Sequence, residues 1–190
     1  MTPMMEQYFE VKDKYKDYIL FYRLGDFYEM FFEDAQVASR ELELTLTGRD
    51  CGEEQRAPMC GVPYHSAEGY IGKLISAGYK VAICEQTEDP ALAKGLVNRE
   101  VIRVVTPGTL IESTLLPETR NNYLAALYSD DGSFGICFCD ISTAYMTSTV
   151  ITGADAETLL ANELSTYMPR EIISNVPFSD IEAVSKWLAE

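Results

Sequence analysis

The first part of the chain switches between helical and strand periodicity. From Met5 to Tyr18, apolar residues recur every three or four positions, which predicts an amphipathic helix. Ile19 to Leu24 is a short apolar run that predicts a strand, and residues 32–44 return to the helical period with two acids in the first turn. Between these segments lies the stretch RLGDFYEMFF, residues 23–32, where an acid interrupts a run of aromatic residues.

The acid decides how this stretch is interpreted. At a strand's period of two, Phe27 and Glu29 point to one face, while Tyr28 and Met30 point to the other. Gly25-Asp26 is a turn dipeptide, so a hairpin with the preceding strand is predicted. Because burying an unpaired carboxylate costs roughly several kcal/mol, we expect the Phe27/Glu29 face to meet something other than the core. The alternative is that Phe27 is a core aromatic and Glu29 a solvated strand residue.

Helices and strands continue to alternate up to residue 105. A polar loop is predicted at 48–57, a constrained apolar segment at Pro58–Pro63, and a polar excursion at Thr87–Arg99. Ser66 or His65 is placed to cap a helix. The remaining elements predicted here are a helix at Ala67–Ala77 and strands at Leu44–Thr47, Tyr79–Glu85 and Val101–Val105. This order predicts a mixed β-sheet covered by helices, an α/β (α+β mixed) fold.

A change of pattern after residue 112 predicts a domain boundary. Residues 113–122 contain Pro117 and show no clear period, so we expect domains over 1–112 and 123–190 joined by a linker over 113–122. The second domain is predicted to run strand, strand, strand, helix, strand, helix, with a hairpin turn at Asp130-Asp131-Gly132. Its elements are expected at Tyr123–Ser129, Ser133–Ile141, Ala144–Ile151, Asp155–Met168, Glu171–Ser174 and from Ser179 to the end.

The composition is that of an ordinary globular protein. Of 190 residues, 47% are hydrophobic and 24% charged. No apolar run approaches the roughly 20 residues that a membrane span requires, and the start lacks a basic, apolar signal peptide. We therefore expect a cytoplasmic protein with no membrane partner.

Cysteine and histidine give no sign of a metal site or a disulfide framework. The five cysteines are odd in number and form no C-x-x-C pair. Cys137 and Cys139 share one face of a predicted strand, where we expect small buried hydrophobes. The single histidine, His65, has no nucleophile or metal-ligand spacing around it and is expected to cap or pack.

The charge argues against tight DNA binding by this chain alone. The net charge is −15, whereas affinity for DNA rests on Lys and Arg that neutralise phosphates. The imbalance is uneven: residues 1–110 carry 12 Lys/Arg against 18 Asp/Glu, and residues 111–190 carry 3 against 12. A local basic patch is predicted only in the first part, from Arg49, Arg56, Lys73, Lys80, Lys94, Arg99 and Arg103.

Several ordered sequence blocks carry a resemblance. Beside GDFYE at 25–29, these are TPMMEQY at 2–8, GVPYHS at 61–66, VAICEQTEDP at 81–90, RVVTPGT at 103–109 and NNYLAAL at 121–127. In this order the chain resembles the N-terminal part of the MutS family of DNA mismatch-repair proteins, whose mismatch-binding domain carries a Phe-x-Glu motif. The three-residue motif alone would be uninformative, and the ordered blocks make the resemblance specific.

The resemblance implies a role for the central stretch. Phe27 would insert as an aromatic wedge at mispaired or unpaired bases in duplex DNA, and Glu29 would lie beside it. A protonated Glu29 can donate a hydrogen bond to a base, and an ionised one cannot. Weaker DNA-contact candidates are Arg23, Leu24, Met59 and Gly61.

The resemblance also implies properties of a longer protein. The second domain would be the start of a connector domain similar to a ribonuclease H fold, which contributes to binding MutL. The full-length protein would be a homodimeric ATPase that uses ATP and Mg²⁺. Since no G-x-x-x-x-G-K-[ST] loop occurs, the chain is expected to be a fragment with no cofactor, metal or catalytic residue of its own.

Two other functions stay open. Residues 121–190 could dock a partner as a protein-interaction scaffold, without DNA contact by this chain. A nuclease is the third and least favoured hypothesis, because Asp140 at a strand end has no identifiable companion carboxylates and a fold analogy does not license a catalytic claim.

Overall fold

The chain forms two compact units, Met1–Thr106 and Pro107–Glu190. This computed structural model describes residues 1–52, 56–88, 95–111, 116 and 120–189. The linker predicted at 113–122 therefore lies largely outside the described residues, and parts of the predicted loop at 48–57 and of the excursion at 87–99 do so too.

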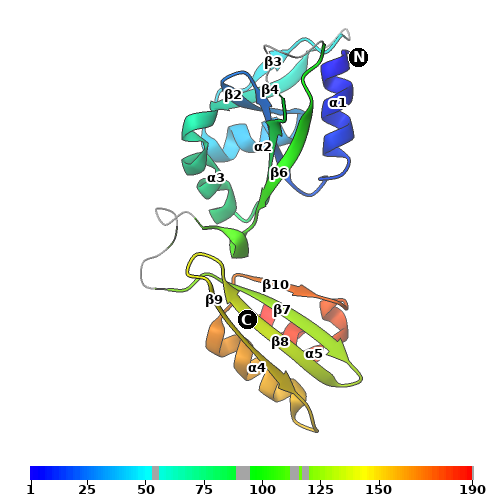
Figure 1. Ribbon diagram of the computed structural model, residues 1–190, viewed down its shortest axis with the longest axis vertical. Coiled ribbons are helices and arrows are strands. Elements are labelled where there is room, and N and C mark those ends of the chain that lie inside the picture. The colour runs from blue at the N-terminus through cyan, green and yellow to red at the C-terminus, as the bar shows by residue number, and fades with distance from the viewer. Residues whose placement is uncertain (53–55, 89–94, 112–115, 117–119, 190) are drawn as a thin grey trace. The chain divides into compact units, whose positions relative to one another are not determined.

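The first unit is built on a six-stranded mixed sheet with strand order β3-β4-β2-β1-β5-β6. Strands β1 and β5 pair in parallel and the other neighbours are antiparallel. The elements are α1 (Pro3–Lys12), β1 (Ile19–Leu24), β2 (Phe27–Phe31), α2 (Phe32–Leu42), β3 (Thr47–Arg49), β4 (Ala57–Pro63), a 3-10 turn η1 (Tyr64–Ser66), α3 (Ala67–Ser76), β5 (Val81–Gln86) and β6 (Arg99–Val105). In Figure 1, α1 lies on one side of this sheet, and α2 and α3 lie on the other.

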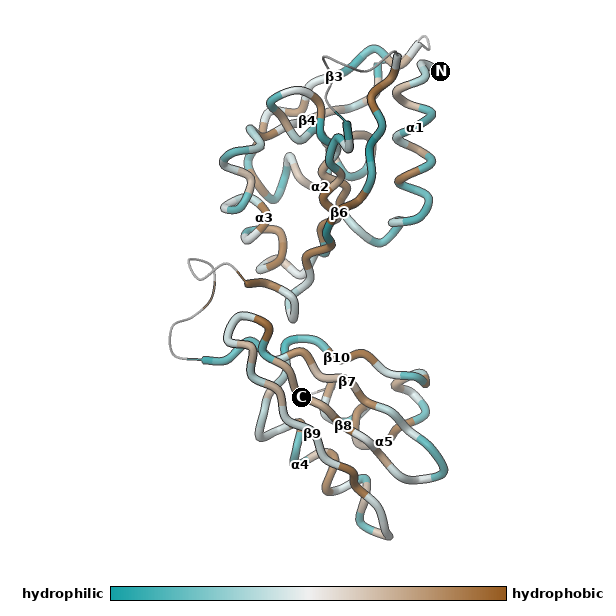
Figure 2. Tube along the Cα trace, viewed as in Figure 1, coloured by the Kyte–Doolittle hydropathy of each residue, from teal (hydrophilic) through white to brown (hydrophobic). Residues whose placement is uncertain are grey.

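Helix α1 covers only part of its side of the sheet. Tyr8 is buried with its ring centroid 5.1 Å from that of Phe31 and 5.5 Å from that of Tyr22. Apolar and polar residues alternate along α1, visible as brown and teal bands in Figure 2, so one stripe faces the sheet. Phe31 at the end of β2 is fully buried, whereas Phe27 at its start is 47% exposed. The Phe27 end of this face is therefore open.

A half-buried ion pair ties α1 to the sheet and to α2. Lys12 Nζ lies 2.9 Å from Asp34 Oδ1 and also donates to the carbonyl oxygen of Tyr18. Asp34 Oδ2 accepts from the backbone N–H of Leu20 at 2.9 Å. Burial raises the pKa of Asp34, and these hydrogen bonds only partly offset the cost of desolvating its carboxylate.

Three predictions in the first unit are wrong in detail. The first helix ends at Lys12 rather than continuing to Tyr18, and the chain then passes through turns. The predicted strand Leu44–Thr47 is instead Thr47–Arg49, because the end of α2 bonds back to Leu44 through both the backbone and the hydroxyl of Ser39. Ser66 takes the N-cap position of α3, but its hydroxyl donates to Pro63 rather than capping the helix.

The second unit is a four-stranded sheet with order β10-β7-β8-β9, covered on one face by two helices. Strands β7, β8 and β9 are antiparallel neighbours, and β10 pairs with β7 in parallel. Its elements are η2 (Pro107–Thr109), β7 (Tyr123–Asp130), β8 (Ser133–Asp140), β9 (Tyr145–Ile151), α4 (Ala156–Tyr167), β10 (Glu171–Ser174), η3 (Phe178–Asp180) and α5 (Glu182–Ala189). The predicted element order is confirmed, although the last helix begins at Glu182 rather than Ser179.

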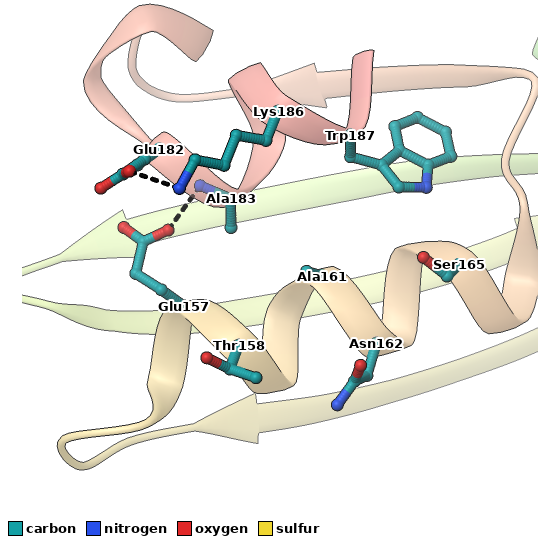
Figure 3. A pocket seen from close by; sticks show the side chains of 9 residues that line it. All are labelled: Glu157, Thr158, Ala161, Asn162, Ser165, Glu182, Ala183, Lys186 and Trp187. Atoms are coloured by element: carbon teal, nitrogen blue, oxygen red, sulfur yellow. Dashed lines mark hydrogen bonds and ion pairs between the residues drawn. The ribbon is translucent and has the colours of Figure 1, made fainter. Parts of the chain in front are cut away.

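Helices α4 and α5 pack side by side on this sheet. Glu157 on α4 accepts a hydrogen bond from the backbone N–H of Ala183 at 2.7 Å, and Glu182 pairs with Lys186 within α5 (Figure 3). Since Glu157 satisfies an N–H at the start of α5, it locks the two helices together. Trp187, the single tryptophan of the chain, lies on α5 and reports on this unit alone.

The opposite face of the second sheet is open and apolar. Exposed side chains along it include Tyr128, Met146, Val150 and Ile173. Cys137 and Cys139 share this face, as predicted, but they are half-buried rather than buried. An antiparallel sheet with one solvated face normally carries polar side chains there, so this face is unusual.

No helix in the described part of the chain is long and apolar enough to cross a membrane.

Candidate functional site

The candidate site begins at a tight hairpin. Strands β1 and β2 pair antiparallel with Leu24 opposite Phe27, so Gly25 and Asp26 alone form the turn. Gly25 has a φ of +57°, a left-handed conformation that glycine adopts without the penalty of a Cβ. The hairpin predicted from Gly25-Asp26 is confirmed.

The predicted division of β2 into two faces is also confirmed. Tyr28 and Met30 are buried at 7% and 0% exposure, while Phe27 protrudes and Glu29 is partly exposed. Pro63 lies opposite Phe27 on β4. Phe27 is therefore not a core aromatic, and the structure presents its ring at the tip of the hairpin.

Glu29 is not the unpaired acid that its strand position suggested. Its Oε2 lies 2.5 Å from Nη1 of Arg49, which stands on the edge strand β3 and reaches across β4. The side chain of Glu29 is 14% exposed and that of Arg49 37% exposed. The sequence placed Arg49 in a basic patch and did not predict this partner, because the pairing of β3, β4 and β2 could not be derived from local pattern.

Gly61 leaves room for this ion pair. It lies opposite Glu29 in the pairing of β2 with β4. A Cβ at Gly61 would sit 3.3 Å from the carbonyl oxygen of Tyr28 and 3.5 Å from Cγ of Glu29. A larger residue would crowd the aliphatic part of Glu29 as it lies along β4.

Arg23 braces the hairpin from within the protein. Its Nε donates to the carbonyl oxygen of Gly25 at 2.6 Å, and Nη1 lies 3.1 Å from Glu85. Its guanidinium stacks over the ring of Tyr64 at 3.5 Å from the ring centroid. The hydroxyl of Tyr28 also donates to Glu85, and burial followed by that bond raises the pKa of Tyr28. Tyr64, an exposed aromatic in the GVPYHS block, was not among the predicted site residues.

The remaining site candidates lie close by. Leu24 and Met59 are half-buried and pack against the core cluster around Tyr8 and Phe31. Met59 is opposite Phe31, and Leu24 is opposite Phe27. The structure thus brings all six predicted positions onto the strands β1, β2 and β4, with Met59 at the buried Phe31 end of β2, while their contact with DNA stays a prediction.

The predicted basic patch does not form as one surface. Arg99 is buried, with its guanidinium donating to the backbone of Arg23 and to Gln7. The prediction that Arg99 belongs to an exposed basic patch was wrong, because nothing in the sequence around an arginine at a strand start indicates that it is buried. Arg49 is committed to Glu29, and Lys94 lies outside the described residues. Exposed members are Arg56, Lys73 and Lys80.

His65 and Asp140, the two residues weighed as catalytic or metal-binding candidates, make contacts that support the fold. His65 is exposed in η1 and contacts the ring of Tyr64. Asp140 is buried and accepts from the Ser142 hydroxyl at 2.6 Å and from the backbone N–H groups of Ser142 and Asn122. Burial by itself raises the pKa of Asp140, but these hydrogen bonds bring it below its ordinary value. The described residues contain no cluster of three or more His, Cys, Asp or Glu that could hold a metal.

The fold and the geometry of the site define a class of protein. This is a two-domain mixed α/β protein whose first domain presents an aromatic side chain and a paired acid at the open end of a sheet. Residues 2–114 match the family described as MutS domain I, and residues 122–188 match MutS domain II. The chain belongs to the MutS family.

Relatives agree along the whole chain. The DNA mismatch repair protein MutS of Acetivibrio thermocellus is 59% identical over 190 residues, covering 100% of this chain and 22% of the relative. The DNA mismatch repair protein MutS of Lachnoclostridium phytofermentans is 60% identical over 178 residues, covering 94% of this chain and 19% of the relative. The chain therefore spans about a fifth of the length of these relatives.

Proposed function

We propose that this chain serves DNA mismatch repair by recognising mispaired or unpaired bases in duplex DNA, with Phe27 as the inserted side chain. The observation that carries the proposal is that Phe27 stands half exposed at a braced hairpin tip, within a match to MutS domain I. A ring exposed at a hairpin tip is free to contact a ligand, whereas a ring buried in the core is not.

The physical basis is the deformability of a mispair. An aromatic or apolar side chain inserted between base steps partly unstacks them and kinks the duplex. A mispaired step costs less to unstack than a paired one, so the energy of deformation itself separates the two duplexes. Stacking of the Phe27 ring on the displaced base would return part of that cost.

Glu29 would oppose binding to matched DNA. Its carboxylate repels phosphates, and a matched duplex offers no displaced base close enough to use it as a hydrogen-bond partner. The acid thus sharpens discrimination at the expense of general affinity. Most of the phosphate contacts would lie in other parts of a longer protein, because the chain itself carries a net charge of −15.

The test uses a full-length protein in which this chain is followed by the further domains of its longer relatives. Phe27→Ala should lose about 1–3 kcal/mol of mismatch affinity and leave matched-duplex affinity nearly unchanged. Tyr128→Ala, which removes an exposed ring in the second domain, is the matched control. Equal losses on both duplexes, or no loss, would contradict the proposal.

A companion variant tests the acid. Glu29→Gln removes the charge and places an amide N–H donor where the carboxylate had none, so it should tighten matched-duplex binding and narrow the ratio of mismatched to matched affinity. Glu33→Gln makes the same change of charge on α2, at an exposed position outside the site, and should leave the ratio unchanged.

For the whole protein we further propose the partners implied by its family: a homodimer that binds ATP, Mg²⁺ and MutL. A docking role for the second domain is favoured by its open apolar sheet face with Tyr128 and Val150. Replacing both residues with Lys should abolish co-migration of the full-length protein with MutL if that face is the docking surface. Unchanged co-migration would place MutL elsewhere.

A further inference from the structure

The ion pair between Glu29 and Arg49 lies beside the exposed Phe27 and joins two strands that are not neighbours in the sheet. Arg49 lies on an edge strand only three residues long, and its guanidinium is turned across β4 onto the carboxylate beside the protruding Phe27. An arginine on an edge strand could equally point into water or toward a phosphate. Here its charge is directed at the acid.

We propose that Arg49 is a positioning residue for Glu29: it holds the carboxylate in one place on the sheet, and thereby sets how strongly the site prefers a mispair. This inference rests on the proposed function of Phe27 and Glu29. Arg49 acts through Glu29 and not through a phosphate contact of its own.

Three features of the site support this assignment. Nη1 of Arg49 makes a charge-assisted hydrogen bond to Oε2 of Glu29, and the side chain of Glu29 is mostly shielded from water. Gly61 opposite Glu29 lacks the Cβ that would crowd this side chain. Arg23 lies opposite Tyr28, on the other face of the hairpin from Glu29, where it is engaged by Gly25, Glu85 and Tyr64.

The consequence for binding follows from geometry and charge. A carboxylate held by a guanidinium has a fixed position. The entropy cost of ordering the Glu29 side chain for a hydrogen bond with a displaced base is therefore already met in the free protein. Because Arg49 partly compensates the charge of the Glu29 carboxylate, the carboxylate repels only the phosphates close to it and not the duplex as a whole. Without Arg49 the acid can rotate and repel any duplex. The preference for a mispair should then fall.

The experiment is a double-mutant cycle in the full-length protein. Dissociation constants are measured for a mismatched and a matched duplex with wild type, Arg49→Met, Glu29→Ala and the double variant. We expect Arg49→Met to lower the mismatch preference by about threefold or more, and to have no effect on the preference once Glu29 is Ala. Arg49→Lys, which keeps a charge that can reach the acid, should restore much of the preference.

Controls separate the inference from simpler roles. If Arg49 binds a phosphate, Arg49→Met weakens both duplexes equally and lowers the slope of log affinity against log salt by about one, which overturns the inference. Arg56→Met removes an exposed cation near the start of β4 and should leave the preference unchanged. Thermal denaturation of each variant identifies any loss caused by unfolding, and Arg49→Lys then carries the test.

The two proposals fail in different ways. If Glu29→Ala does not change the preference, the proposed function of the acid fails. If Glu29→Ala changes it but Arg49→Met has the same effect in both backgrounds, only the positioning role of Arg49 fails.

Discussion

The stability of Phe27→Ala separates a binding side chain from a packing one. Full burial of a phenylalanine side chain contributes about 1.5–3 kcal/mol. Because Phe27 is 47% exposed, its truncation should lose roughly half of that, about 1 kcal/mol. Phe31 lies on the same strand and is fully buried, so Phe31→Ala should cost about 3–5 kcal/mol. For a unit of this size, the first change lowers the melting temperature by about 4 °C and the second by more than 10 °C.

The assay can follow the two units separately. The first unit contains no tryptophan, so Trp187 fluorescence follows the second unit alone as an internal control. Near-UV circular dichroism of the tyrosines, eight of the twelve of which lie in the first unit, is then compared with the Trp187 transition, and a shift seen only in the tyrosine signal belongs to the first unit. The Trp187 transition should not move in either variant. If Phe27→Ala destabilises the first unit as strongly as Phe31→Ala, the ring is a packing residue and its proposed insertion into DNA loses its structural basis.

Three further predictions concern the residues that support the site and the two cores. Because the pKa of Asp34 is raised, the folded state keeps a proton that the unfolded state releases near pH 3.8. The contribution of Asp34 to the free energy of unfolding should therefore fall as the pH rises from 3.8 through the raised pKa. Asp34→Asn should remove that part of the pH dependence, measured by chemical denaturation of the first unit. The lowered pKa of Asp140 has the opposite effect, so the second unit should lose stability as the pH falls below about 3.8. Asp140→Asn should lower the free energy of unfolding by about 1–3 kcal/mol at neutral pH, measured by Trp187 fluorescence. An unchanged unfolding midpoint would refute this prediction. Arg23→Ala removes the brace of the hairpin and should cost about 2 kcal/mol and speed amide hydrogen exchange around residues 24–28, whereas unaltered exchange would show that the tip needs no brace.

The sequence predicted correctly those elements whose signal lies in neighbouring residues. The two-residue turn at Gly25-Asp26 and the alternation of Phe27, Tyr28, Glu29 and Met30 depend on neighbours in sequence, so the hairpin and its two faces could be predicted. The same holds for the order of elements in the second unit, where Asp130 to Gly132 forms the turn between β7 and β8.

What could not be predicted depends on contacts between distant segments. Arg49 meets Glu29 only because β4 lies between β3 and β2, an order that crosses the sequence. Arg99 is buried because Gln7 and the backbone of Arg23 accept its donors, and nothing in its own neighbourhood signals this. The ion pair between Lys12, at the end of the first helix, and Asp34 likewise joins segments that are distant in sequence. Sequence pattern gave the candidate residues, and tertiary pairing gave their partners.

Photo-crosslinking can detect whether the Phe27 ring stacks on the mispaired base. With 5-iodouracil as one base of the mispair, an aromatic ring stacked on that base crosslinks to it efficiently. In the full-length protein, mass spectrometry should locate the crosslink at Phe27, and the yield should fall sharply on a matched duplex and in Phe27→Leu. A crosslink to another residue, or an equal yield at Phe27 on matched DNA, would contradict the account.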